Sequence, residues 1–196
     1  MKIRRALIAV PLALAAIATS SLAAAPKATP QIVDAKGDSA AGQASLDILS
    51  VLYATSGTGT GRAYLPKKLT VTLTLASAPD TRGVVNYNLK ADTDGCGIIN
   101  IHFAPGNAIG SLIGDSYARF GSCQDAGVYF PAKIKGSVVS FEFALKAIGV
   151  DRGTEFSAFT ATVDAGEPAT GIFGTQGGPA AGLGDKATGD GTWVIP

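Results

Sequence analysis

The sequence is poor in the side chains that most often build catalytic and metal centres. It has one histidine, two cysteines and one tryptophan among 196 residues, and only 16% of its residues are charged. A zinc site of Cys and His ligands, and most histidine-based catalytic sites, need more of these residues than the chain has. Sixteen basic and 15 acidic residues give a net charge of +1, whereas nucleic-acid binding needs a surplus of basic side chains. The composition therefore argues against such enzymes and predicts no nucleic-acid partner.

Residues 1–23 have the organisation of a secretory signal peptide. Three basic residues precede an almost wholly apolar stretch from Ala6 to Ala18, and small residues follow it. This order is typical of a secretory signal, with cleavage expected after Ala23. A retained membrane anchor is the alternative, but the apolar run is shorter than the ~20 residues that span a bilayer. We expect a secreted, bacterial extracellular protein whose mature form has no transmembrane anchor and is mildly acidic.

The two cysteines, Cys96 and Cys123, are expected to form one disulfide. An exported protein folds in an oxidising compartment, where the only two thiols of a chain favour pairing. On the loop-entropy model, closing a loop of this size contributes about 3–4 kcal/mol. A redox-active or nucleophilic cysteine is the alternative, but the pair lacks the CxxC spacing of redox centres.

Apolar and polar residues alternate in several short runs, which predicts β-strands. From Leu69 to Leu75 every second residue is leucine or valine, and the residues between them are threonine. Related runs occur at residues 46–51, 85–89, 99–103 and 139–145. Because no segment shows a sustained helical period, the pattern predicts one all-β domain over residues 32–196, after a short linker at 24–31. We expect a two-sheet antiparallel sandwich, immunoglobulin-like or jelly-roll-like, with a closed barrel as the alternative.

Aspartates gather near both ends of the expected domain. Asp34 and Asp38 flank a glycine-containing segment near its start, and Asp185 and Asp190 flank another near its end. If the terminal strands lie side by side, these four carboxylates converge, and Ca²⁺ takes about six to eight oxygen ligands of this kind. The alternative is that each aspartate caps a local turn by accepting backbone hydrogen bonds. All four are candidate calcium ligands, and the chain requires no other cofactor.

Several segments carry a resemblance to a known family: Asp34-Ala-Lys-Gly-Asp38, Asp47-Ile48, the Thr-rich strand, Asp92-Thr-Asp94-Gly95, the strand from Val139 to Leu145, and Asp185-x-Ala-x-x-Asp190-Gly191. In this order they resemble the DOMON-like sandwich modules, which include the glucodextranase C-terminal type and relatives of family 9 carbohydrate-binding modules. Ala35 departs from the proline that is usual after the first aspartate, and Thr188-Gly189 departs from the usual Pro-Asp. The resemblance implies a non-catalytic, immunoglobulin-like sandwich that binds sugar, haem or Ca²⁺.

Catalytic arrangements are hard to assemble from this chain. A serine hydrolase would depend on His102, and no Gly-x-Ser-x-Gly nucleophile motif accompanies it. A glycosidase needs two facing carboxylates, but Glu142 alternates with apolar residues and therefore points to solvent. Any haem iron would also have to use His102, whose strand alternation places it on the solvent face. An extracellular hydrolase ranks third, and we expect a protein without catalytic activity.

Sugar binding requires a flat aromatic surface flanked by polar groups. The candidate ligand-binding residues are Tyr53, Tyr64, Tyr117 and Trp193, although large aromatic side chains also fill the cores of sandwiches. The sequence thus predicts a secreted monomer that binds an extracellular polysaccharide and carries a structural calcium ion. The alternative is a protein-interaction or envelope structural domain that uses its sheet edges or the Gly166–Gly184 segment.

Overall fold

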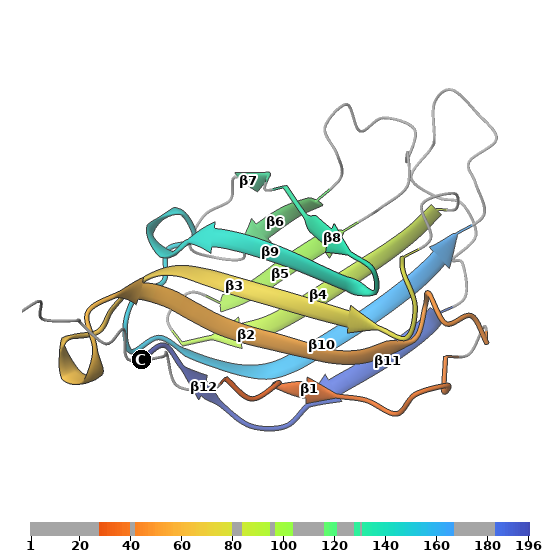
Figure 1. Ribbon diagram of the computed structural model, residues 1–196, viewed down its shortest axis with the longest axis horizontal. Helices are drawn as coiled ribbons and strands as arrows, with labels where there is room; N and C mark the ends of the chain where they lie inside the picture. Colours follow the sequence, from red (N-terminus) through yellow and green to blue (C-terminus); the bar gives the residue numbers. More distant parts are fainter. Residues whose placement is uncertain are drawn as a thin grey trace, which may run out of the picture.

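Alternating apolar side chains build the strands, and the strands form two antiparallel sheets that stack as a sandwich (Figure 1). Along residues 69–75 the leucines and the valine are buried, while the threonines between them are only partly buried. The computed structural model describes residues 28–39, 42–79, 84–94, 97–103, 116–120, 128–129, 131–166 and 183–196. The all-β, two-sheet architecture expected from the sequence is confirmed.

The first sheet has five strands in the order β1-β2-β3-β9-β8. Their bounds are β1 Ile32–Val33, β2 Ile48–Thr58, β3 Leu65–Leu75, β9 Val138–Ala144 and β8 Lys133–Lys135. Two short 3-10 helices flank it, η1 at Gly61–Ala63 and η2 at Leu145–Ala147. The register of β2 with β3 shifts between Ile48 and Ser50, which lets Ile48 and Val51, three residues apart, both be buried.

The second sheet has seven strands in the order β11-β10-β4-β5-β6-β7, with β12 paired to β10. Their bounds are β11 Leu183–Gly189, β10 Glu155–Gly166, β4 Val84–Thr93, β5 Gly97–Phe103, β6 Ser116–Phe120, β7 Val128–Tyr129 and β12 Trp193–Val194. The long strand β10 bends at Ala158, which has a φ of 49°, and its pairing with β4 shifts between Ser157 and Thr160. On the N-terminal side of this irregularity, β10 pairs with β12 as well as with β4.

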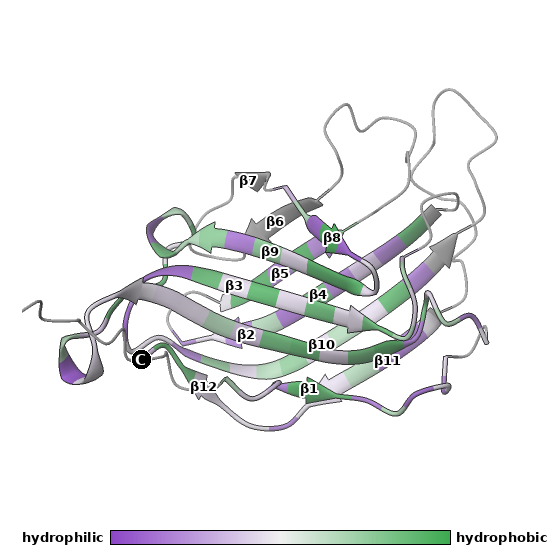
Figure 2. Cartoon of the chain, viewed as in Figure 1, coloured by the Kyte–Doolittle hydropathy of each residue, from purple (hydrophilic) through white to green (hydrophobic). Residues whose placement is uncertain are grey.

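The two inner faces form one hydrophobic core, and green positions alternate with pale or purple ones along strands such as β3 and β9 (Figure 2). Its largest side chains include Tyr53, Tyr87, Phe141 and Phe156, all at most 1% exposed. Among the described residues no helix is long and apolar enough to cross a membrane. The core places β1, at the edge of the first sheet, against β11 of the second (Figure 1).

Residues 1–27 and both cysteines lie outside the described residues, so the signal peptide and the Cys96–Cys123 disulfide stay predictions.

Candidate functional site

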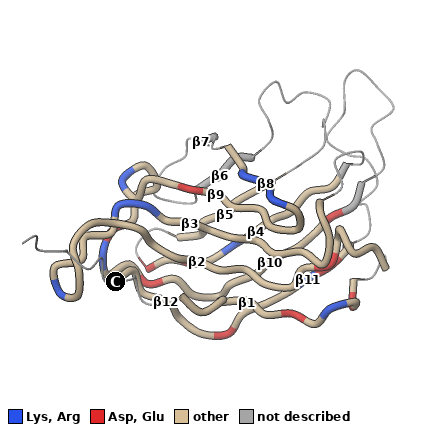
Figure 3. Tube along the Cα trace, viewed as in Figure 1, with Lys and Arg blue, Asp and Glu red and all other residues tan. Residues whose placement is uncertain are grey.

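Three of the four predicted calcium ligands come together where β1 meets β11. One carboxylate oxygen from each of Asp34, Asp38 and Asp185 lies within 4.8 Å of the others. A Ca²⁺ ion binds oxygens at about 2.3–2.6 Å, so ligands on opposite sides of it stand about 5 Å apart. The three oxygens are therefore spaced for a shared cation. We call these three residues the acidic cluster; Figure 3 shows acidic positions along this edge of the sandwich.

Asp185 holds the cluster in place from β11. It is 6% exposed, and its Oδ2 accepts a hydrogen bond of 2.7 Å from the backbone N–H of Ile48. Its Oδ1 accepts one from the backbone N–H of Lys186, also at 2.7 Å. Ser39 adds a second link to this strand, because its hydroxyl donates to the carbonyl oxygen of Gly184 at 2.9 Å. The turn that follows β1 is thus tied to β11 beside the acidic cluster.

A fourth carboxylate, that of Asp47, lies behind the turn that joins Asp34 to Asp38. Asp47 is 2% exposed, and its Oδ2 accepts a hydrogen bond of 2.7 Å from the N–H of Gly37 within that turn. Its Oδ1 is buried and has no hydrogen-bond partner in the described structure, and the same is true of Asp34 Oδ2. Buried carboxylate oxygens without partners are costly unless a positive charge compensates them. Their chemistry therefore suits a cation.

The pKa of the Asp34 carboxyl reflects the burial of this group and the negative charges near it. Burial raises its pKa above the ordinary value of 3.8, and the hydrogen bond from the N–H of Ala35 lowers it. The charges of Asp38, Asp185 and Asp47 raise it further. The cluster is therefore an electrostatically unfavourable arrangement that a divalent ion would relieve.

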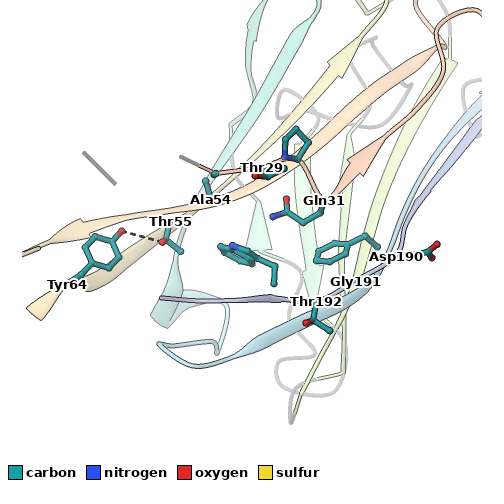
Figure 4. Close-up of a pocket in the computed structure, with 12 residues that line it drawn as sticks. Thr29, Gln31, Ala54, Thr55, Tyr64, Asp190, Gly191 and Thr192 are labelled. Carbon is teal, nitrogen blue, oxygen red and sulfur yellow. Dashed lines mark hydrogen bonds between the residues drawn. The ribbon is translucent and has the colours of Figure 1, made fainter. Parts of the chain in front are cut away.

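The fourth predicted ligand, Asp190, is not in the acidic cluster. It lies beyond the end of β11, where it lines a pocket of about 590 Å³. The pocket walls come from residues 28–31, from Ala54 and Thr55 of β2, from Tyr64 after η1, from Phe159 and from residues 190–193. In Figure 4, Tyr64 stands at one end of the pocket and Asp190 at the other, with Gln31 between them. The segment expected to be a linker thus contributes a wall of this pocket.

Trp193 provides the largest aromatic surface of the pocket. It is half-buried, and its ring packs edge-on against Phe156, with a centroid distance of 5.2 Å. Tyr53 supports it from the core at 6.5 Å. Contacts of this kind restrict the rotation of the indole, so the pocket has a rigid aromatic wall.

Some polar side chains of the pocket form hydrogen bonds within the protein, and others do not. The side-chain amide of Gln31 pairs with the backbone of Tyr53, accepting from its N–H at 2.6 Å and donating to its carbonyl oxygen at 3.4 Å. The hydroxyl of Tyr64 donates to Thr55 Oγ1 at 3.3 Å (Figure 4). Within the part of the chain that the structure describes, the side chains of Asp190 and Thr192 make no hydrogen bond. Both residues are exposed.

The other two aromatic candidates have different positions. Tyr53 is completely buried, so it supports the pocket and cannot present its ring to a ligand. Tyr117 belongs to β6, where its backbone pairs with His102 on one side and Tyr129 on the other; its side chain lies outside the described part of the structure. Of the four predicted aromatic residues, Tyr64 and Trp193 line one pocket.

The hydroxyl of Tyr53 leads to a stability prediction. It is buried without a hydrogen-bond partner in the described structure, and burial raises the Tyr53 pKa far above its ordinary value. We expect Tyr53→Phe to raise the free energy of unfolding by about 1 kcal/mol, because an unpaired buried hydroxyl is removed without a cavity. Tyr87→Phe is the matched control, since the equally buried Tyr87 hydroxyl donates to the Ser45 carbonyl oxygen at 2.6 Å. Urea denaturation should show that this control loses stability; an equal loss in both variants would contradict the assignment.

The residues considered for catalysis have structural partners. His102 is half-buried on the outer face of the second sheet, with Nδ1 3.0 Å from Asn88 Oδ1, and Asn88 donates to Asp164 at 3.0 Å. Burial lowers the His102 pKa, and the charge of Asp164 opposes this shift. Glu142 is exposed as predicted and forms an ion pair with Lys68 at 2.6 Å, which lowers the Glu142 pKa.

Three site residues have no strong sequence signal. Asp47 lies between the buried residues Leu46 and Ile48, just before β2. Its place in the Asp47-Ile48 segment of the family resemblance marks it, but no part of the sequence pattern assigns it to the site. Gln31 and Thr55 belong to segments whose composition is ordinary for linkers and strands. Comparison of the chain with known proteins found no matching family model, curated protein or solved structure.

Proposed function

We propose that this protein is a secreted, non-catalytic binding module that holds a sugar ring of an extracellular polysaccharide in the Trp193 pocket. In this proposal, a calcium ion at the acidic cluster stabilises the adjacent sheet edge. The observation that carries the proposal is the pocket itself, where an aromatic wall stands beside hydroxyl, carboxylate and backbone groups. The resemblance of the sequence to DOMON-like and family 9 carbohydrate-binding modules supports the same ligand class.

The chemistry of the pocket matches a sugar better than an apolar ligand. The faces of a pyranose ring carry C–H groups that pack on an indole, while its edge carries hydroxyl groups that need polar partners. Trp193 supplies the flat surface, and Asp190 and Thr192 supply an acceptor and a hydroxyl at the same wall. The open carboxylate of Asp190 favours a neutral polyol, whose hydroxyls donate to it, over an acidic ligand.

Calcium is the cation that the acidic cluster fits best. Its donors are carboxylate oxygens, and Ca²⁺ accepts varied oxygen shells more readily than Mg²⁺, which demands near-ideal octahedral geometry. Asp34, Asp38 and Asp185 would hold the ion, which supplies positive charge between the turn after β1 and strand β11. The ligand pocket uses other residues, so the ion would not contact the ligand directly.

The first test is retention of the purified mature protein on a panel of insoluble polysaccharides, in calcium and in chelator. We expect retention on at least one polymer, and Trp193→Ala should weaken it by about tenfold or more, since 1.4 kcal/mol of lost contact corresponds to that factor. Tyr64→Ala is a second pocket variant, chosen because Tyr64 does not support the core. Leu65→Ala is the matched control, because Leu65 is the neighbouring residue, 58% exposed and outside the pocket.

The outcomes separate sugar binding from protein binding. Retention that is lost in both pocket variants and kept in Leu65→Ala supports the proposal, provided that thermal melting shows each variant to be folded. Absence of retention on every polymer, with and without calcium, would overturn it and favour the protein-interaction alternative. Retention that is unchanged in the pocket variants would place the binding surface elsewhere.

A further inference from the structure

The acidic cluster and the pocket share two segments of chain. The first segment runs from Gln31, a pocket wall, through β1 to Asp34, a member of the cluster. The second runs along β11 from Asp185, in the cluster, to Asp190, in the pocket. A strand rises about 3.3 Å per residue, so the three residues from Gln31 to Asp34 span about 10 Å and the five from Asp185 to Asp190 span about 17 Å at most. Each segment therefore connects the two sites directly.

The two segments touch at the pocket end. A Cβ atom placed on Gly189 would lie 2.1 Å from the carbonyl oxygen of Gln31 and 3.2 Å from the Ile32 side chain. The backbones of β1 and β11 are thus in direct contact beside the pocket. A shift of β1 relative to β11 would move the Gln31 wall, and with it the shape of the pocket.

Strand β1 is a short edge strand. It is two residues long, and among the described residues it pairs only with β2, through hydrogen bonds that include Gln31 N–H to the Val51 carbonyl oxygen and Asp34 N–H to the Leu49 carbonyl oxygen, both 3.0 Å. The buried Ile32 anchors it in the core, but within the described part of the chain no backbone pairing joins it to β11. Interactions at the acidic cluster therefore add to the contacts that set how closely β1 approaches β11.

The charges of the acidic cluster affect how closely β1 and β11 approach each other. Asp34 and Asp38 belong to the β1 side and Asp185 to the β11 side, so their negative charges oppose the approach of the two segments. The buried, unpartnered Oδ1 of Asp47, whose other oxygen binds the turn at Gly37, adds a second indication that a cation belongs here. A bound divalent cation reverses the sign of the interaction, because it attracts both sides at once.

We propose that Ca²⁺ binding to the acidic cluster clamps β1 against β11 and thereby raises the affinity of the Trp193 pocket for its ligand. This inference rests on the proposed function and adds a regulatory link to it. Coupling of this kind is reciprocal: ligand in the pocket raises the calcium affinity by the same factor, typically about fivefold or more. The protein then binds its ligand tightly only where extracellular calcium is available.

The single tryptophan of the chain makes the link measurable with calcium alone. Trp193 lines the pocket and is not part of the acidic cluster, so its fluorescence reports on the pocket. We expect Ca²⁺ to lower the quenching of Trp193 by acrylamide, because the clamped wall restricts access to the indole. Calorimetry on the same samples measures calcium binding itself. Asp38→Asn removes a cluster carboxylate and should abolish both signals, whereas Asp92→Asn, at an exposed aspartate of β4, should change neither.

Each result has a distinct meaning. Calcium binding together with reduced quenching, lost only in Asp38→Asn, supports the coupling. Calcium binding without a change at Trp193 overturns the coupling and leaves the metal site intact. No calcium binding by calorimetry overturns the coupling and the calcium part of the proposed function together, while retention on a polysaccharide in chelator would still support the sugar site. A Trp193 response that persists in Asp38→Asn also overturns the coupling, because it would arise from another site.

Discussion

Gly189→Ala is expected to destabilise the fold by about 3 kcal/mol or more, the upper range for inserting an atom into a packed site. The added Cβ would meet the Gln31 carbonyl oxygen at 2.1 Å and its carbonyl carbon at 2.9 Å. These are backbone atoms, so no side chain can rotate away to make room. The only relief is separation of β1 from β11, which exposes the buried side chain of Ile32.

Thermal melting with circular dichroism tests this prediction. Thr188→Ala is the control, because Thr188 is the preceding residue of β11 and is exposed. We expect this control to melt within a few degrees of the wild type and Gly189→Ala to melt far below it. A Gly189→Ala protein as stable as the wild type would contradict the close contact between the two strands.

Calcium removal is expected to have the second large effect. A ligand that binds only the folded state at about 100 times its dissociation constant adds about 2.7 kcal/mol to the free energy of unfolding. For a chain of this size, 1 kcal/mol shifts the melting temperature by about 2–4 °C. We therefore expect chelation to lower the melting temperature by about 5–10 °C. The loss arises because the carboxylates of the cluster then repel one another without compensation.

Two variants test whether the effect of calcium on the melting temperature arises at the acidic cluster. Asp38→Asn should make the melting temperature insensitive to calcium, and it should not weaken the chelated protein, since Asp38 is exposed and makes no hydrogen bond in the described structure. Asp92→Asn should keep the full calcium response. A calcium response that survives in Asp38→Asn, or its absence from the wild type, would show that the acidic cluster is not the binding site.

The fold was accessible from sequence wherever apolar residues alternate without interruption. The strands around residues 69–75 and 139–144 are the clearest cases. Strand β10 could not be predicted in this way, although it lies inside the second sheet, because its pattern changes phase: Phe156 and Phe159 are both buried, three residues apart, across the bend at Ala158. Strand β11 was equally hard to predict, because its buried positions include Gly184 and Asp185, which no hydrophobic pattern reveals.

Part of the candidate site could also be predicted from the sequence. Aspartates near glycines at the two ends of the domain mark the acidic cluster, and the close approach of β1 and β11 brings three of them together. Asp190 is separated from them because the strand carries it five residues further on, to the pocket. The pocket itself joins several segments that are distant in sequence, so only the packing of the two sheets brings its residues together.

The lysines of edge strand β8 affect whether copies of the protein associate at high concentration. It is the outer strand of the first sheet, and all three of its residues, Lys133-Ile134-Lys135, are exposed, with basic positions visible along it in Figure 3. An open edge is a template on which further strands can add, and lysines are among the residues that oppose such growth. A second copy that docked there edge to edge would bring like charges together and strip water from their ammonium groups. The two lysines of β8 thus oppose the edge-to-edge strand addition at this edge that would lead to fibres.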